Sequence, residues 1–222
     1  MDSRHLPLNL LTTLEAHREL YERARILHGD ISLRNLMTNS SDHSRGVLVD
    51  LDMARQVDTP RWRDPYSAER NTASVSGGTA AFRALDLLRE DPTQQVLYRH
   101  DLESFLYALV WLVTHYEDGH PVVPPYMDVS GWCLGEGRHQ SDVYDAKKAF
   151  LADPTSQGLS CEHELARTWL PRLCQMFHTG YTARDVIREH PAPANSVTAS
   201  FDIETLGGHV TYEKFMEVLT GL

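Results

Sequence analysis

Lysine is scarce in this sequence, and positive charge in general is in deficit. Lysine occurs only at Lys147, Lys148 and Lys214, so none precedes Lys147. Acidic residues outnumber basic ones by 31 to 21, which gives a net charge of −10 at neutral pH. A nucleic-acid-binding surface needs clustered positive charge. The sequence therefore argues against a general nucleic-acid-binding role, and we expect no nucleic-acid partner.

Cysteine is also sparse, and its spacing has no recognisable pattern. The three cysteines, Cys133, Cys161 and Cys174, form no C-x-x-C pair, and the twelve histidines include no H-E-x-x-H motif. These absences exclude a disulfide framework and a zinc finger. We expect reduced thiols in an intracellular protein.

Long apolar runs are missing as well. The longest, Phe105 to Val113, falls well short of the ~20 residues that span a bilayer. The residues that follow Met1 are polar, so we expect no signal peptide. We predict no membrane association and a location in the cytoplasm or nucleus.

Helical periodicity dominates the first half of the sequence. Apolar residues on one face predict a helix that ends near Arg25. A stripe of large apolar residues beginning at Asp101 predicts a helix buried on most of its circumference, at the centre of the core. Between them, Val47–Val49 predicts a short strand. Residues 53–84 form a long irregular stretch, a length that is unusual in a compact domain unless it is functional.

The second half predicts shorter elements. Helices are expected at about 141–152 and 161–178, and Pro171 should kink or split the second one. Residues 190–200 have the composition of a linker. A last short helix is expected at 212–219.

Three polar motifs occur in a fixed order. His28 to Asn35 reads H-x-D-x-x-x-x-N, Asp50-Leu51-Asp52 follows the predicted strand, and Gly78-Thr79 precedes Ala84-Leu85-Asp86 and the helix at Asp101. Each motif alone has a structural explanation, because Asp50 could cap a turn and Asp101 could cap a helix. The order and spacing of all three together point to chemistry.

Phosphoryl transfer explains why these residue types belong together. The protein mainly positions groups and neutralises charge in this reaction. A carboxylate must accept or orient the proton of the attacking hydroxyl, and Asp30 fits that task. Magnesium prefers hard oxygen ligands, which Asn35 and Asp50 would supply.

With these motifs the sequence resembles the eukaryotic protein kinase fold, specifically the fungal-type protein kinase family. His28–Asn35 resembles the catalytic loop and Val47–Ala54 the magnesium-binding motif. Gly77–Leu88 resembles the end of the activation segment. Arg99–Trp111 (RHDLESFLYALVW) is similar to the family's H-D-L-E-S-F-x-Y signature. The resemblance covers about residues 9–180.

The resemblance implies a mainly α fold, a protein-kinase-like C-lobe with a few short β-strands around the catalytic loop and metal-binding motif. The lobe would occupy residues 1–186, and 187–222 would be a linker and a short C-terminal helix. The implied activity is ATP- and Mg-dependent phosphoryl transfer to a hydroxyl of an unidentified protein substrate. Ser or Thr acceptors are expected ahead of Tyr.

The resemblance also implies a role for each motif residue. Asp30 would be the catalytic base, and Asn35 and Asp50 the magnesium ligands. Thr79 would contact the catalytic loop near the substrate hydroxyl, within an activation segment at 53–84.

Three further residues would give structural support. His28 belongs to the catalytic loop itself, Asp101 would anchor the backbone of this loop, and Asp86 would pair with an arginine lower in the lobe.

The sequence departs from the usual kinase pattern at two positions of the loop. Gly29 takes the place of the arginine of H-R-D, so that arginine's grip on an activation-loop phosphate is absent. Ser32 takes the place of the lysine usual in Ser/Thr kinases, and Arg34 would supply a cation instead.

The largest departure concerns the small lobe that holds ATP. No Gly-rich phosphate loop, V-A-I-K strand or lysine precedes the loop at His28. We therefore expect this chain alone to be inactive, with an apolar surface where the two lobes would meet. That surface would bind a partner or a second copy. The alternatives are a non-catalytic, pseudokinase-like binding module and, because of H-G-D, a small-molecule phosphotransferase related to aminoglycoside and choline kinases.

Overall fold

Helices predominate in the structure, a computed structural model that describes residues 6–57, 80–89, 95–135, 137–159, 164–190 and 201–221. The α-helices are α1 (Leu6–Ala24), α3 (Tyr98–His115), α4 (Gln140–Ala152), α5 (Glu164–Glu189) and α6 (Tyr212–Thr220). Three short 3-10 helices accompany them: η1 (Ala80–Phe82), η2 (Leu85–Leu88) and η3 (Ser130–Trp132). The mainly helical fold class is confirmed.

The strands are short and pair as three two-stranded antiparallel sheets. The pairs are β1 (Ile26–Leu27) with β4 (Arg55–Gln56), β2 (Leu36–Thr38) with β3 (Gly46–Leu48), and β5 (Tyr116–Glu117) with β6 (His120–Pro121). The strand predicted at Val47–Val49 is β3, shifted by one residue. The first two pairs flank the polar loop 28–35, so they fix both of its ends.

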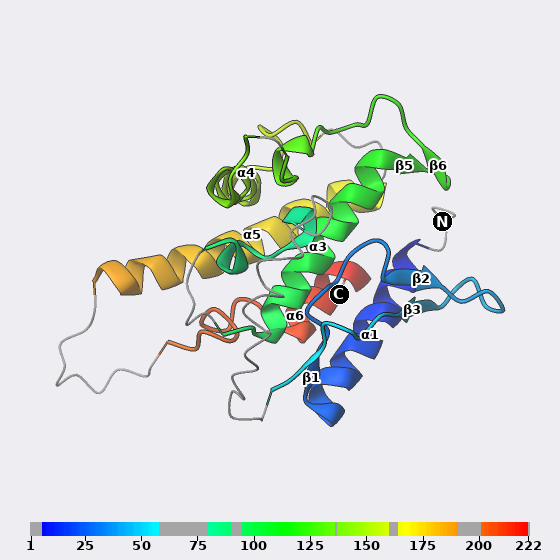
Figure 1. The fold of residues 1–222 in the computed structure, drawn as a ribbon, viewed down its shortest axis with the longest axis horizontal. Coiled ribbons are helices and arrows are strands. Elements are labelled where there is room, and N and C mark those ends of the chain that lie inside the picture. Colours follow the sequence, from blue (N-terminus) through cyan, green and yellow to red (C-terminus); the bar gives the residue numbers. More distant parts are fainter. Residues whose placement is uncertain are drawn as a thin grey trace.

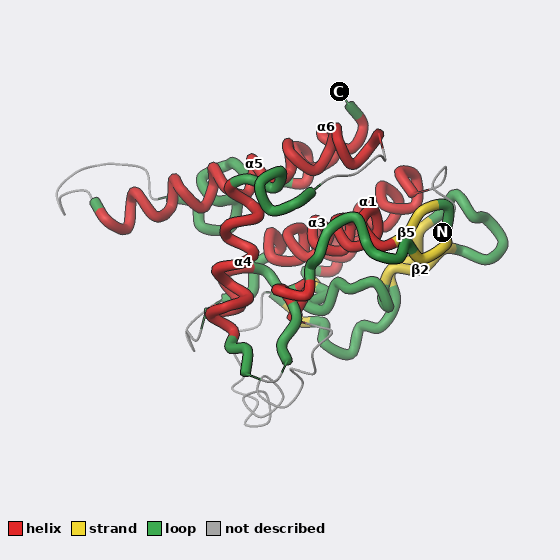
Figure 2. Tube along the Cα trace, turned by 90° about the horizontal axis from the view of Figure 1, so that it is seen from above, coloured by secondary structure: helices red, strands yellow, loops and turns green. Residues whose placement is uncertain are grey.

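The core is built around α3, which runs through the centre of the molecule (Figure 1). Its apolar side chains are fully buried on nearly every side, as the sequence predicts. Helix α5 packs against α3, and α4 packs against α5, η2 and η3. Figure 2 shows α5 and α6 on one side of α1 and α3, with most of the loops on the other side.

Helix α1 lies directly against β3, and Gly46 makes this close approach feasible. A Cβ atom at Gly46 would lie 1.9 Å from Thr13 Oγ1 and 2.1 Å from Asn9 O. The Gly46 amide donates to Thr12 Oγ1 at 2.7 Å. These contacts hold β3 in place beside the polar loop. The helix predicted to end near Arg25 ends at Ala24.

The prediction for the helix around Pro171 is wrong in its extent. Pro171 lies inside helix α5 without splitting it, and the helix extends to Glu189 instead of ending near residue 178. Proline inside a helix removes one backbone hydrogen bond and costs about 3 kcal/mol. Buried side chains along one face of α5 offset this cost by packing on the core, among them Leu170, Leu173 and Phe177.

The C-terminal segment 201–221 returns to the body of the domain. Helix α6 begins after Thr211, whose Oγ1 accepts a hydrogen bond from the Lys214 amide. It packs against α1 and α5, and its apolar face, including Phe215, is buried. Within the described ranges, none of the helices combines the length and apolarity of a membrane span.

Candidate active site

The polar loop 28–35 is anchored to α3 through its backbone. Asp101, in the first turn of α3, accepts hydrogen bonds from the amides of His28 (2.9 Å) and Gly29 (3.1 and 3.3 Å). Burial alone would raise the pKa of Asp101, but hydrogen bonds from His17 and Gly29 outweigh this effect and lower the pKa. The ionised carboxylate therefore fixes the backbone just before Asp30.

Gly29 suits the conformation of the loop at this point. Its φ of +76° lies in the left-handed region, which glycine adopts without steric cost. A Cβ atom here would lie 2.9 Å from the carbonyl oxygen of Met53. Glycine therefore lets the segment after Asp50 pass close to the loop.

His28 connects the loop to the end of β3. The Asp30 amide donates to His28 Nδ1 at 3.3 Å, so Nδ1 is unprotonated. The proton is then on Nε2, which donates to the carbonyl oxygen of Val49 at 3.0 Å. His28 therefore links the backbone of Asp30 to the residue that precedes Asp50.

Asn35 and Asp30 are in direct contact. Asn35 Nδ2 donates to the Asp30 carbonyl oxygen at 2.8 Å and to Asp30 Oδ2 at 3.2 Å. The backbone carbonyl oxygen of Asn35 also accepts a hydrogen bond from the Val49 amide at 3.0 Å. With its nitrogen turned towards Asp30, Asn35 presents its amide oxygen as the atom able to bind a cation.

Asp50 reaches this region through the backbone rather than through a side-chain contact. It follows Val49 directly, and its side chain is exposed to solvent. Its φ of +67° is unusual for a residue other than glycine, and its Oδ1 accepts a hydrogen bond from the Asp52 amide at 3.4 Å. Within the described ranges no hydrogen bond joins Asp50 to Asp30 or Asn35.

The predicted substrate-site residues Thr79 and Arg34 stay predictions. Thr79 lies outside the described residues, as does most of the stretch 53–84. Arg34 is exposed. Ser32 is buried, and its Oγ has no hydrogen-bond partner in the described part of the chain.

Arg83 is a charged neighbour of Asp30 that the sequence motifs did not single out. Burial lowers the pKa of its guanidinium, the attraction of the Asp30 carboxylate opposes this effect, and repulsion from Arg55 adds to it. The position follows η1 within the string Gly77–Leu88, so the signal was present in the motif. Only the glycine, threonine and acidic residues of that string were assigned roles from the sequence, and Arg83 was not.

Asp86 lies at the centre of a buried ionic cluster. Its Oδ2 accepts from Arg99 Nη2 at 2.6 Å, and its Oδ1 accepts from Arg184 Nη1 at 2.5 Å. Burial works against ionisation, but contacts with His100, Arg99 and Arg184 hold the pKa of the Asp86 carboxyl below its usual range. The sequence predicted one arginine partner, and the structure has two, from α3 and α5.

A second buried polar group, centred on Glu103, supports the same segment. Glu103 Oε1 accepts from the Leu85 amide (3.0 Å) and the Tyr107 hydroxyl (2.6 Å), and its Oε2 accepts from the Tyr181 hydroxyl (2.5 Å). Since Leu85 begins η2, these bonds tie η2 to α3 and α5.

Lys147 holds the other end of this segment. Its ammonium is fully buried and donates to the carbonyl oxygens of Ala80 (3.1 Å) and Arg83 (2.6 Å). It also lies 3.9 Å from the ring centre of Tyr107. Burial holds the pKa of Lys147 well below its usual value. The backbone that carries Arg83 is therefore fixed from α4.

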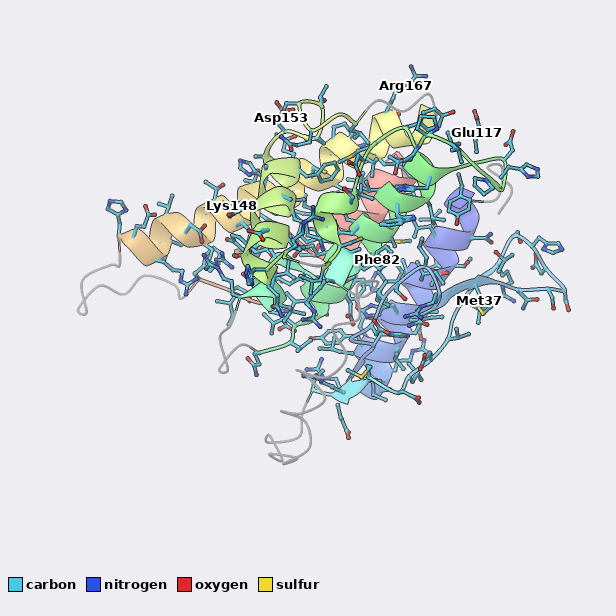
Figure 3. The ribbon with its side chains drawn as sticks, turned by 45° about the horizontal axis from the view of Figure 1, so that its top comes forward. Met37, Phe82, Glu117, Lys148, Asp153 and Arg167 are labelled. Carbon is cyan, nitrogen blue, oxygen red and sulfur yellow. The ribbon has the colours of Figure 1, made fainter. Side chains whose placement is uncertain are left out.

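The spacing of the sequence around Lys147 indicates that this lysine is buried. Lys147 follows Val143 by four residues and precedes Phe150 by three, which is the spacing of one helical face. Both neighbours are buried. Its neighbour Lys148, labelled on α4 in Figure 3, is exposed.

Replacing these two lysines separately tests the structural role of Lys147. We expect Lys147→Ala to lower the free energy of unfolding by about 2–5 kcal/mol, since it opens a cavity and leaves two carbonyl groups without a donor. Lys148→Ala should change it by less than about 0.5 kcal/mol. Urea unfolding of both variants provides the measurement, and equal small losses would contradict the assignment.

A comparison with known families agrees with the motifs. The sequence model described as fungal protein kinase matches residues 3–113, half of the chain. The matched range includes the polar loop 28–35, Asp50, Asp86 and most of α3, with Asp101. A search of curated proteins finds no match. With the family model covering half of its length, the chain belongs to the fungal protein kinase family.

Proposed function

We propose that the chain supplies the base-bearing and magnesium-binding part of an ATP-dependent protein kinase. The observation that carries this proposal is the contact of Asp30 with Asn35 beside the strand end that bears Asp50. Catalysis of phosphoryl transfer consists largely of positioning and charge neutralisation, which such a loop can provide. The acceptor would be a hydroxyl of a protein substrate, with Ser or Thr ahead of Tyr.

Asp30 is suited to act as the base. Its Oδ2 is held by Asn35, while its Oδ1 is buried and has no hydrogen-bond partner among the described residues. A buried, unpaired carboxylate oxygen is costly, and a substrate hydroxyl would satisfy it. As the hydroxyl oxygen forms its bond to the terminal phosphorus of ATP, its proton would pass to Asp30 Oδ1, and the bond to the ADP oxygen would break.

The oxygen atoms of Asn35 and Asp50 fit magnesium. An amide oxygen and a carboxylate are the hard ligands that this ion prefers. Bound there with ATP, magnesium would neutralise charge on the phosphates. The left-handed backbone of Asp50 supports a functional role, because such outliers of non-glycine residues cluster at functional sites. Among the described residues no group of three or more His, Cys, Asp and Glu suits a metal, so the proposed ligand set depends on Asn35.

Arg83 fits the task of the cation beside the base. The lysine expected at the position of Ser32 is absent, and Arg34 is exposed. Arg83 is more deeply buried, and its charge interacts with Asp30. We infer that Arg83 would attract the incoming phosphate beside Asp30, and that Thr79 would line the substrate side of this site.

ATP would be gripped by a small lobe that docks beside the loop. Within the 222 residues, no Gly-rich loop and no lysine precede His28. Met37 and Leu51 are exposed large apolar side chains at 53% and 48%, and they lie next to the residues that carry the site. Figure 3 labels Met37 on the ribbon of β2 and β3. A small lobe would cover this surface, and a second copy of the chain is the alternative occupant.

The unpaired thiols favour an intracellular location, in the cytoplasm or nucleus. Cys133 and Cys174 form no disulfide. Free cysteines are typical of reducing compartments.

Nucleotide binding and transfer together test the proposal. The chain alone should bind Mg·ATP no more tightly than about 1 mM, roughly 4 kcal/mol of binding free energy, because the residues of this sequence include no Gly-rich phosphate loop before His28. Joined to a nucleotide-binding kinase small lobe, it should phosphorylate protein hydroxyls. Calorimetry and radiolabel transfer provide the measurements.

The second candidate, a non-catalytic binding module, makes the opposite forecast. It is favoured by Gly29 and Ser32, which take the places of the arginine and the lysine of the usual kinase loop. If the joined protein binds ATP but transfers no phosphate to any acceptor in a peptide library, the catalytic proposal is wrong. Micromolar Mg·ATP binding by the chain alone, lost in Asp50→Ala, would instead refute the need for a small lobe.

A further inference from the structure

A buried hydrogen bond joins the C-terminal helix to the first helix of the chain. The hydroxyl of Tyr212, the first residue of α6, lies 2.7 Å from Nδ1 of His17 in α1. His17 is fully buried and Tyr212 is 4% exposed. The two residues are 195 positions apart, so only the docking of 201–221 brings them together.

The same imidazole continues the connection towards the polar loop. His17 Nε2 lies 2.8 Å from Asp101 Oδ2. That oxygen also accepts hydrogen bonds from the amides of His28 and Gly29. An unbroken, buried chain of hydrogen bonds therefore runs from α6 through α1 and α3 to the backbone just before Asp30.

The Asp101 carboxylate fixes the direction of the bond at its end of this chain of hydrogen bonds. Asp101 is an acceptor because its pKa is lowered, so His17 Nε2 carries a proton and donates to it. At the other end, the Tyr212 hydroxyl keeps its proton because burial raises its pKa, and it can either donate to His17 Nδ1 or accept a hydrogen bond from it.

Aromatic packing holds the Tyr212 hydroxyl in this position. The ring of Tyr212 stacks on Tyr98 with 4.9 Å between ring centres and 11° between planes, and Tyr21 lies at 6.2 Å. The preceding turns are fixed as well, because Arg99 Nε donates to the Ile203 carbonyl oxygen at 2.7 Å. The Tyr212 hydroxyl therefore has little freedom to move away from His17.

We propose that Tyr212 and His17 are positioning residues for the loop that carries Asp30, and that segment 201–221 is thereby part of the support of the active site. Tyr212 holds the imidazole ring of His17 in place, and His17 orients the Asp101 carboxylate towards the two loop amides. That the positioned loop performs catalysis rests on the function proposed above. The hydrogen-bond chain itself does not, and its test needs neither ATP nor substrate.

Nitrogen NMR of the unmodified protein tests the protonation of His17. We expect His17 Nε2 to carry a proton whose resonance is shifted by the hydrogen bond to Asp101. An Nε2 atom without a proton would overturn the proposal, because His17 could not then donate to Asp101.

Hydrogen exchange of the His28 and Gly29 amides tests the connection to the loop. In Tyr212→Phe, His17 Nδ1 loses its hydrogen-bond partner, and we expect these amides to exchange about tenfold faster or more, relative to amides in the centre of α3. Tyr98→Phe is the matched control, since it removes a hydroxyl from the same stack that donates to the Val210 carbonyl oxygen instead.

The two variants separate positioning from general stability. A selective effect of Tyr212→Phe on the loop amides supports the proposal. Equal acceleration in both variants, or none in either, would mean that α6 only adds stability to the domain, and the proposal would fail. If Tyr212→Phe does not fold, the nitrogen spectrum of the unmodified protein decides alone.

Discussion

In the chain joined to a nucleotide-binding small lobe, Asp30→Asn is expected to lower the turnover number by about 10²–10⁴-fold. The amide has nearly the shape of the carboxylate and can still contact Asn35, which now donates to Asp30 Oδ2 at 3.2 Å. It cannot take up the proton of the attacking hydroxyl. The loss should therefore fall on turnover, with little change in the Michaelis constant for ATP.

Asp52→Asn provides the matched control for this measurement. Asp52 is an exposed carboxylate two residues after Asp50, and only its backbone amide contacts that residue. Its replacement makes the same change of charge near the site without touching Asp30. Equal turnover in the Asp30→Asn variant and the unmodified protein would refute the assignment of the base. Equal losses of turnover in Asp30→Asn and Asp52→Asn would mean that the loss reflects only the change of net charge.

The periodicity of the sequence was sufficient to predict the central helices. The apolar spacing after Asp101 predicts a helix buried on most of its circumference, and α3 has that burial because most of its side chains face other elements. Pro171 misled the prediction for α5, since the local cost of proline is offset by packing that no local pattern contains. Local rules thus predicted the ends of α1, α4 and α6 to within a residue or two, and failed at the C-terminal end of α5.

The candidate site was predictable where its residues are close in sequence. Asp30 and Asn35 are five residues apart, and the structure brings their side chains together. The predicted convergence of Asp50 stays a prediction, because within the described residues its side chain is joined to neither of them. Their roles in catalysis likewise stay predictions until activity is measured.

The supports of the site were harder to foresee, because they join distant segments. His17 and Tyr212 meet only after α6 has docked, and Lys147 reaches carbonyl groups 64 and 67 positions away. Neither pairing leaves a periodic or motif-like signal across such separations. Burial of a polar residue on an apolar helical face is the available clue, and Lys147 shows it.

Removal of the Asp86 carboxylate should be the most damaging single change to stability. Asp86→Asn leaves the guanidinium groups of Arg99 and Arg184 buried without their shared counter-charge. Breaking a buried ion pair in this way costs about 3–5 kcal/mol, a large part of the roughly 5–15 kcal/mol that is typical of a folded domain. Urea unfolding near neutral pH should therefore show a much lower midpoint.

Asp185→Asn is the control that isolates burial from charge. Asp185 binds the same arginine, with 2.8 Å between its Oδ1 and Arg184 Nη2, but its side chain is 34% exposed. Because solvent still reaches the Asp185 carboxylate, this variant should lose clearly less than Asp86→Asn, about 1 kcal/mol. Comparable losses of unfolding free energy in both variants would show that the two carboxylates stabilise Arg184 equally. Asp86 would then not be the main counter-charge of the buried cluster.

The pH dependence of the Asp86→Asn effect gives an independent test of the same cluster. The folded pKa of Asp86 lies below the unfolded value of about 3.8, so the unfolded state binds the proton first as the solution is acidified. The stability that Asp86 contributes is thus fully present well above pH 3.8 and declines as the pH falls below it towards the folded pKa. The amide introduced by the substitution does not titrate, so the difference in stability between the two proteins should narrow only in acid. A difference that stays constant from neutral pH down to about pH 2 would mean that the carboxylate charge does not stabilise the fold, and that Arg99 and Arg184 are held by packing alone.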